Sequence, residues 1–259
     1  MSESIAFDRA AEYYDATRGL SEEGVRYTTE ALAEVFRGAG PILEVGVGTG
    51  QVALPLHGAG VRVMGVDLSR PMLSKLLVKA GGALPFPLVE GDAASLPFTD
   101  DAFGGAYLRW VLHLIPDWRA AVREIERILT PGSTFIAALG AYGGYRQEMQ
   151  ARFAEITGIS TEPVGLAWNG WDELDAEVTS LGLQKLPDIG FTDHDRDDIE
   201  HFMQAIEGNR FSWTWAVPDA TTREDAAVEV RRWAEDRWGS LSEIPPESFE
   251  WRFAVYRLP

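Results

Sequence analysis

The sequence predicts a doubly wound α/β fold, in which a mostly parallel sheet carries helices on both faces and ends in an antiparallel strand. From Pro41 onward, short apolar segments alternate with stretches of helical periodicity, a pattern typical of parallel sheets with right-handed crossovers. The first apolar segment leads directly into a glycine-rich turn at residues 46–50. Acidic residues follow the next two segments, at the points where their strands would end.

The apolar segments and their stop signals define the expected elements. A helix is expected at residues 51–56, and the clearest one follows Pro116, because apolar residues recur there at helical spacing and residues 130–132 read as a stop. A later helix is expected to begin at a capping box formed by Thr221 and Glu224. The strands are expected at residues 42–45, 61–66, 87–89, 104–108, 134–138, 184–189 and 248–256.

The length of 259 residues and the hydrophobic fraction of 46% suit one domain with one main core. We expect a single domain over residues 1–259, made of a helical lid (1–40), a cofactor-binding core (41–139), a helical cap with one strand (140–247) and a final strand (248–259). No apolar run approaches the length that spans a bilayer, and the first residues lack a basic segment followed by an apolar one. A cytoplasmic location is therefore expected.

Composition excludes several chemistries. The chain has no cysteine, which excludes disulfides, thiolate metal sites and a cysteine nucleophile. No metal site is expected. The formal net charge of −17 disfavours nucleic acid and anionic membranes as partners. Arg119, Arg123 and Arg127 form a helical stripe, which we interpret as a solvated face. The charge favours a neutral or cationic small partner, and the oligomeric state is left open.

The glycine-rich turn is the strongest chemical signal, because it joins a strand to a helix in the manner of Rossmann-like ligand-binding turns. Gly46 suits a tight turn, Gly48 removes a side chain where a ligand would lie, and Gly50 allows the helix to pack closely on the strand. A dinucleotide fingerprint would place a further glycine at position 51, where this chain has Gln51. A nicotinamide dehydrogenase therefore ranks below other cofactor classes.

Acidic residues at successive strand ends strengthen this interpretation. Asp67 lies 23 residues after Glu44, close to the spacing at which an acid meets a ribose hydroxyl. The alternative role for Asp67 is the cap of a helix beginning near Pro71. Asp92 follows the third strand at the same edge of the sheet. Three acids at three consecutive strand ends are hard to explain as helix caps.

These segments resemble the class I methyltransferases that use S-adenosylmethionine (SAM), in particular the broad subgroup related to the quinone-biosynthesis methyltransferases. The likeness covers most of residues 7–138. It rests on LEVGVGTG (43–50), VDLSRPML (66–73), GDAASLPF (91–98), residues 102–118 and LTPGS (129–133). The segment FDRAAEYYDATRG (7–19) is similar to the amino-terminal helix that closes over SAM in this subgroup.

The resemblance implies SAM as cofactor and assigns roles at its methionyl and ribose ends. It places Glu44 near the methionyl group, with Gly46 and Gly48 beneath it and Thr49 in the same turn. It also implies that Asp67 accepts hydrogen bonds from the ribose hydroxyls.

The resemblance likewise assigns the adenine end. Leu68 and Met72 would flank the ring, Asp92 would accept from its exocyclic amine, and the Ala93 amide would face it. Arg109 would border the reactive methyl group.

Two residues of the amino-terminal segment complete the implied site. Tyr14 and Arg18 are placed at the methionine carboxylate, although an ordinary amphipathic helix with a surface arginine explains them nearly as well.

Methyl transfer from SAM requires alignment of donor and acceptor more than a general base. His113 is the best-placed base for a phenol, hydroxyl or amine acceptor, and a packing role beside the sheet is its alternative. The fourth strand runs into Leu108, Arg109 and Trp110 and lacks the Asn/Asp-Pro-Pro-Tyr/Phe motif with which relatives bind adenine, cytosine or glutamine amines.

The acceptor is expected to be a small molecule. Six tryptophans fall in the expected cap, and packing in the core is the default role for each of them. A lid rich in aromatic rings over a SAM cleft nevertheless favours a partly apolar or aromatic acceptor. The six tryptophans are Trp168, Trp171, Trp213, Trp215, Trp233 and Trp238. The alternative function is a regulatory protein that binds SAM without transferring its methyl group.

Overall fold

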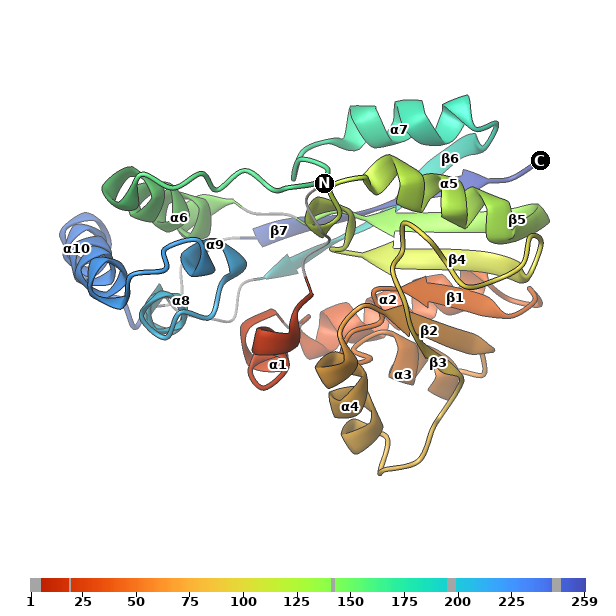
Figure 1. The fold of residues 1–259 in the computed structure, drawn as a ribbon, viewed down its shortest axis with the longest axis horizontal. Helices are drawn as coiled ribbons and strands as arrows, with labels where there is room; N and C mark the ends of the chain where they lie inside the picture. Colours follow the sequence, from red (N-terminus) through yellow and green to blue (C-terminus); the bar gives the residue numbers. More distant parts are fainter. Residues whose placement is uncertain (1–5, 19, 141–142, 195–198, 244–247) are drawn as a thin grey trace. The chain divides into compact units, whose positions relative to one another are not determined.

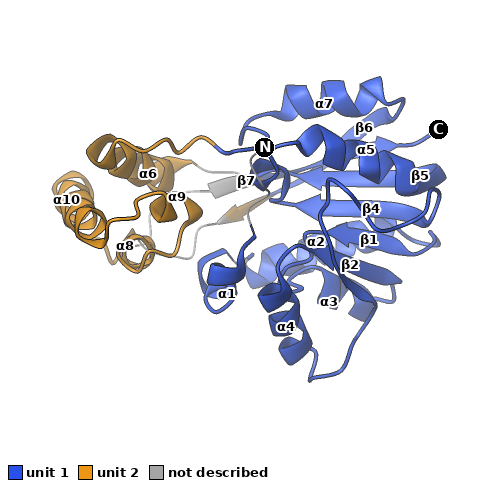
Figure 2. Ribbon diagram, in the orientation of Figure 1, with its two compact units in different colours: residues 1–140, 163–191, 251–259 blue, residues 141–162, 192–250 orange. Residues whose placement is uncertain are grey.

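The computed structural model describes residues 6–18, 20–140, 143–194, 199–243 and 248–259 (Figure 1). The chain divides into two compact units (Figure 2): residues 1–140, 163–191 and 251–259 form unit 1, and residues 141–162 and 192–250 form unit 2. The boundaries cut across the expected cap, because residues 163–191 belong with the sheet. Whether both units act as one domain stays a prediction.

A seven-stranded sheet in the order β3-β2-β1-β4-β5-β7-β6 organises the fold. Strands β1 to β5 pair in parallel, and β7 pairs antiparallel to β5. The fold is therefore the predicted mostly parallel, Rossmann-like sheet with an antiparallel carboxyl-terminal strand. The strands are β1 (Ile42–Val45), β2 (Val63–Asp67), β3 (Leu88–Glu90), β4 (Phe103–Arg109), β5 (Leu129–Ala138), β6 (Gln184–His194) and β7 (Ser248–Arg257).

The strand order locates the place where a ligand can bind. From β1 the chain moves outward to β2 and β3 on one side and later to β4 and β5 on the other. The crossovers diverge between β1 and β4, and a crevice opens outside the carboxyl ends of the strands at such a switch point. Glu44 of β1 lies in register with Tyr107 of β4 at this point.

Helices cover both faces of the sheet in unit 1 (Figure 1). On one face α5 (Trp118–Ile128) and α7 (Trp171–Ser180) bury Val122, Ile125 and Leu174 against strand residues such as Leu43. On the other face α2 (Glu22–Val35), α3 (Ala53–Gly58) and α4 (Arg70–Lys79) pack against residues that include Tyr107. The remaining short elements of this unit are η1 (Asp8–Ala10), α1 (Tyr14–Arg18) and η2 (Leu112–Leu114).

Unit 2 contains four helices among its described residues, packed around an aromatic and aliphatic core of their own. Phe211 and Trp213 stack with ring centroids 5.2 Å apart. Trp168 and Trp171, expected in the cap, belong instead to unit 1. The helices are α6 (Gly144–Thr157), α8 (Ile199–Glu207), α9 (Ser212–Trp215) and α10 (Ala220–Trp238).

Two expected boundaries are wrong. The strand expected at residues 134–138 begins at Leu129, because α5 ends at Ile128 and the extended backbone of Leu129 starts β5 at once. The cap of α10 is Asp219 and not Thr221, since the Asp219 carboxylate accepts hydrogen bonds from the amide (2.8 Å) and hydroxyl (2.6 Å) of Thr222. An aspartate directly before the first helical residue satisfies the free amides without a capping box.

Arg119 and Arg123 of the arginine stripe on α5 are exposed, as expected, whereas Arg127 is half-buried and donates hydrogen bonds to the carbonyls of Leu96 and Phe98. Arg119 and Arg123 lie within ion-pair distance of Glu177, and Arg127 pairs with Glu124 and Asp100. No helix among the described residues is long and apolar enough to cross a bilayer.

Candidate functional site

The turn after β1 has the backbone that its glycines allow. Gly46, Gly48 and Gly50 have φ angles of 71°, 53° and 76°, in the left-handed region that favours glycine. A Cβ atom would lie 2.3 Å from the side chain of Val111 at Gly46 and 2.8 Å from that of Leu76 at Gly50, so both positions are closely packed. At Gly48 the nearest atom would be 3.5 Å away, on Met72. The glycine of the middle position is therefore the one with space beside it.

Asp67, the last residue of β2, organises this turn. Its Oδ2 accepts a hydrogen bond from the Gly48 amide (2.7 Å), and its Oδ1 accepts one from the Ser69 amide (2.8 Å). The cap of α4 is Ser69, whose hydroxyl accepts from the amide of Met72, so the capping alternative for Asp67 does not hold. Burial raises the pKa of Asp67, and the two amide bonds oppose that rise.

Three buried polar side chains at the carboxyl ends of β1 and β4 have atoms without partners. Glu44 is 5% exposed, Arg109 8% and Tyr107 0%. Within the part of the chain that the structure describes, Glu44 Oε2, Tyr107 OH and Arg109 Nη1 have no hydrogen-bond partner. Leaving a buried donor or acceptor unpaired is costly, and such groups commonly mark a place where a ligand belongs.

Burial dominates the electrostatics of these groups. It raises the pKa of Glu44 to about 8, although the positive charge of Arg109 acts in the opposite direction. Burial also raises the pKa of Tyr107, and Arg109 again opposes it. The four side chains of Glu44, Asp67, Tyr107 and Arg109 therefore share one electrostatic environment at the carboxyl edge of the sheet.

Arg109 is held by neighbours on two sides. Its Nη2 donates a hydrogen bond to Gln51 Oε1 (2.9 Å), and its guanidinium lies 4.5 Å from the ring centroid of Trp110. Trp110 has a φ angle of 58°, which is uncommon for a bulky residue, and stacks on Trp251 with centroids 5.2 Å apart. Backbone strain of this kind concentrates at functional sites.

The residues assigned to the adenine end lie around the ends of β2 and β3. Leu68 is 36% exposed, whereas Met72 and Ala93 are buried. Asp92 follows β3, and its Oδ1 accepts a hydrogen bond from the Ala94 amide (3.0 Å). Its second carboxylate oxygen is not needed for this turn.

The amino-terminal segment reaches the same edge. Tyr14 begins α1, and its pKa is raised by burial, with Arg109, Arg18 and Asp67 contributing smaller electrostatic effects. The Arg18 guanidinium lies 5.8 Å from the Tyr14 ring centroid. Asp15 accepts a hydrogen bond from the Thr49 hydroxyl (2.5 Å), so α1 contacts the glycine turn directly.

His113 lies in η2, and its ring is tilted over that of Trp168 with centroids 4.0 Å apart. Burial, with a smaller contribution from the charge of Arg18, lowers the pKa of His113 to about 3. The imidazole is therefore neutral at physiological pH and a weak base. The base role stays a prediction, and the geometry favours the packing alternative.

Sequence reasoning missed four residues of this region: Asp15, Gln51, Tyr107 and Lys79. Tyr107 looks like an ordinary strand residue, and only the register places it beside Glu44. Asp15 and Lys79 form an ion pair of 2.6 Å between α1 and α4. The segment 7–19 was expected to close over the site, but no spacing rule indicates which of its side chains makes the contact.

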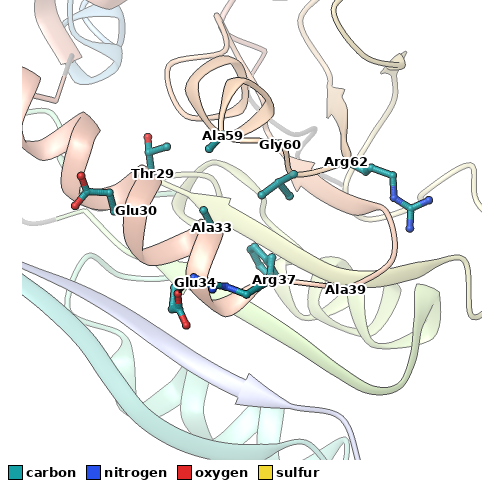
Figure 3. A pocket seen from close by; sticks show the side chains of 12 residues that line it. Thr29, Glu30, Ala33, Glu34, Arg37, Ala39, Ala59, Gly60 and Arg62 are labelled. Atoms are coloured by element: carbon teal, nitrogen blue, oxygen red, sulfur yellow. Dashed lines mark hydrogen bonds and ion pairs between the residues drawn. The ribbon is translucent and has the colours of Figure 1, made fainter.

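A cavity of about 850 Å³ lies elsewhere in unit 1 (Figure 3). It is lined by α2 and by the residues that precede β1 and β2, including Ala33, Arg37 and Arg62. These residues lie at the amino ends of the strands, whereas every predicted site residue in the sheet lies at or beyond the carboxyl ends. The cavity is therefore separate from the candidate site.

Residues 43–137 match the family model described as a methyltransferase domain. A demethylmenaquinone methyltransferase of Mycolicibacterium paratuberculosis is 34% identical over 134 residues, which are 50% of this chain and 56% of that protein. This chain thus spans just over half the length of that relative.

Solved structures share the fold at lower identity. The [4+2]-cyclase SpnF has a TM-score of 0.59 at 17% identity, covering 99% of this chain and 98% of its own. A Haemonchus contortus phosphoethanolamine N-methyltransferase, solved with S-adenosylhomocysteine (SAH), has a TM-score of 0.57 at 17% identity, covering 97% of this chain and 57% of its own. The two carry different activities on one fold, so the fold alone does not assign an activity. Together with the sheet order and the glycine turn, these similarities show a Rossmann-like fold in which residues 43–137 match a methyltransferase domain and about half of the chain is similar to demethylmenaquinone methyltransferases.

Proposed function

We propose that this protein transfers a methyl group from SAM to a small-molecule acceptor. The observation that carries the proposal is the pair of buried polar atoms without partners, Glu44 Oε2 and Arg109 Nη1, beside the glycine turn. A carboxylate oxygen needs a donor, and a guanidinium N–H needs an acceptor. The methionyl end of SAM carries an ammonium and a carboxylate, which supply one of each.

The same comparison of unpaired protein atoms with ligand groups disfavours a dinucleotide. A nicotinamide dinucleotide has no ammonium and carboxylate pair, and its pyrophosphate would bring negative charge toward Glu44 and Asp67. Asp67 still fits a ribose, because a carboxylate has about four lone-pair positions and two amides use only two of them. Asp92 similarly retains an oxygen for an exocyclic amine.

When bound, SAM supplies a methyl carbon activated by its sulfonium. The residues of this chain would then orient the donor and exclude water: Glu44 and Arg109 would hold the methionyl group, with Tyr14 of α1 beside them. Alignment and desolvation of this kind account for much of the rate enhancement in such displacements. A strong general base is not required, in agreement with the low pKa of His113.

The acceptor class follows from charge and from the relatives. A net charge of −17 disfavours polyanionic acceptors, so we infer a neutral or cationic small molecule. The curated relatives are named demethylmenaquinone methyltransferases, which supports a partly apolar acceptor for this chain as well. The Trp110 ring beside Arg109, which stacks on Trp251, is compatible with such an acceptor.

Two measurements test the proposal. Calorimetric titration should show binding of SAM and SAH in the micromolar range or tighter and no measurable binding of NAD or NADP; the reverse ranking would refute the cofactor assignment. Incubation with SAM labelled at its methyl group and a pool of metabolites should then transfer label to an acceptor. Tight SAM binding without transfer to any compound would favour the regulatory alternative.

A further inference from the structure

We propose that Gln51 is a positioning residue that couples the closure of α1 to the placement of Arg109. The inference rests on the proposed function, because it concerns how Arg109 is held at the SAM site. Gln51 occupies the position where a dinucleotide fingerprint would have glycine, so its side chain is an addition to the turn. The structure shows what that side chain contacts on each side.

One side of Gln51 faces α1. Its Nε2 donates a hydrogen bond to Asp15 Oδ1 (2.9 Å), the same oxygen that accepts from the Thr49 hydroxyl (2.5 Å). Asp15 Oδ2 lies 2.6 Å from Lys79 Nζ. Burial acts to raise the pKa of Asp15, but the hydrogen bonds from Lys79, Thr49 and Gln51 hold it below its ordinary value. The Asp15 carboxylate therefore joins α1 to the glycine turn by hydrogen bonds and to α4 by an ion pair.

The other side of Gln51 faces the sheet. Its Oε1 accepts a hydrogen bond from Arg109 Nη2 (2.9 Å). The other terminal nitrogen of Arg109 has no partner in the described structure and is the one available to a ligand. The bond to Gln51 therefore fixes the guanidinium plane and leaves Nη1 presented at the site.

The carboxamide of glutamine suits this position because it has a donor end and an acceptor end. Asp15 requires the donor, and Arg109 requires the acceptor. When α1 leaves the turn, the amide loses its acceptor and is free to rotate, which releases the constraint on Arg109. Closure of α1 and orientation of Arg109 are thus linked through one side chain.

Variants at position 51 separate the contact of Gln51 with Asp15 from its contact with Arg109. Gln51→Glu keeps an acceptor for Arg109 but sets two carboxylates against each other at Asp15. Gln51→Lys keeps a donor for Asp15 but places a positive charge toward Arg109. Hydrogen exchange of α1 (Tyr14–Arg18) reports closure, and calorimetric titration with SAM reports the placement of Arg109.

We expect Gln51→Glu to speed exchange in α1 about three- to tenfold, and Gln51→Lys to leave exchange nearly unchanged while weakening SAM binding by about tenfold. The double variant Asp15→Asn/Gln51→Glu restores a hydrogen bond of reversed polarity at position 51 but loses the ion pair with Lys79, so its exchange rate should fall below that of Gln51→Glu and stay above that of the unmodified protein. Equal exchange in Gln51→Glu and the unmodified protein, or full SAM affinity in Gln51→Lys, would overturn the proposal.

Glu12→Gln provides the matched control. Glu12 pairs with Lys75 at 2.5 Å and so also joins the amino-terminal segment to α4, but it does not touch Gln51. Its removal should leave the effect of Gln51→Lys on SAM binding unchanged. If activity is found, Gln51→Glu should raise KM for SAM more than it lowers kcat, because it acts on closure.

A failure of the proposed function is recognisable separately. If the unmodified protein bound no SAM, the function would be refuted, and exchange in α1 without cofactor would still decide the coupling. In that case Arg109→Lys should speed exchange in α1 with Gln51 present and have no further effect with Gln51→Ala. Equal effects of Arg109→Lys in both backgrounds would show that Gln51 does not link the two residues.

Discussion

The two edges of the sheet in unit 1 differ in how their polar groups are partnered. At the amino edge the polar side chains that line the cavity are exposed or paired, such as Arg62 and the ion pair of Arg37 with Glu34. At the carboxyl edge Glu44, Tyr107 and Arg109 are buried and leave atoms without partners. A cavity therefore marks the amino edge, whereas buried polar atoms without hydrogen-bond partners mark the carboxyl edge. Such atoms indicate which hydrogen-bonding groups a ligand would supply, and a cavity does not.

The largest effect is expected from Asp67→Ala, which would break the organisation of the carboxyl edge. SAM binding should weaken at least tenfold, because charge-assisted bonds to two ribose hydroxyls contribute about 1.5–3 kcal/mol each and the Gly48 amide is released as well. Titration calorimetry measures the loss. Ser69→Ala is the control: it removes the cap of α4, should cost about 0.5–2 kcal/mol of stability and should spare affinity. Full SAM affinity in Asp67→Asn would contradict the ribose role.

Glu44→Gln tests the carboxyl edge through the proton that Glu44 should release when SAM binds. With a pKa of about 8, Glu44 is mostly protonated at pH 7, so binding of the SAM ammonium should release a proton and tighten as pH rises through about 8. The variant should bind about five- to hundredfold more weakly at pH 9 and release no proton, a loss equivalent to about 1–3 kcal/mol. Calorimetry in two buffers of different ionisation enthalpy measures this release. An unmodified protein that releases no proton on binding at pH 7 would contradict the role of Glu44.

The same residue predicts a stability change of defined sign. The pKa of Glu44 is raised from 4.5 to about 8 in the folded protein, so its favourable contribution to folding is complete below about pH 4.5 and is lost as pH rises through about 8. Glu44→Gln should therefore be more stable than the unmodified protein at pH 9 and similar at pH 4.5. Chemical denaturation at both pH values measures the difference, and a variant less stable at pH 9 would show that Glu44 has a partner in the free protein.

His113→Phe should have a small effect. The aromatic ring keeps the contact with Trp168, and a group with a pKa of about 3 contributes little as a base near neutrality. We expect kcat within about threefold of the unmodified value, whereas loss of a true general base would cost about 100- to 10,000-fold. Once an acceptor is known, steady-state kinetics between pH 5 and 9 separates the two roles.

Arg62→Ala should have the smallest effect, since it alters the amino edge only. Arg62 is exposed and lines the cavity, away from the glycine turn. SAM affinity and the free energy of unfolding should both stay within experimental error, because isolated surface substitutions usually change stability by less than about 0.5 kcal/mol. A clear change in SAM affinity would mean that the two edges are not independent.

The sequence by itself determined the strands of the sheet and the glycine turn after β1. Apolar segments placed all seven strands, and the spacing from Glu44 to Asp67 placed two acids at neighbouring strand ends. Such features are local or separated by one crossover, so periodicity and glycine geometry suffice to predict them. The boundaries at Leu129 and Asp219 failed because one residue's backbone angles decide where a helix ends or begins.

Tertiary structure decided which side chains complete the site. Tyr107 joins Glu44 only through the parallel register of β1 and β4, and Asp15 reaches Thr49 and Gln51 across more than 30 residues of intervening sequence. It also decided that Trp168 packs with His113 in unit 1, which lowers the pKa of that imidazole by burial. No single-sequence pattern encodes these pairings, because they depend on strand order and on how segments distant in sequence pack together. The charge state of each site residue follows from that packing.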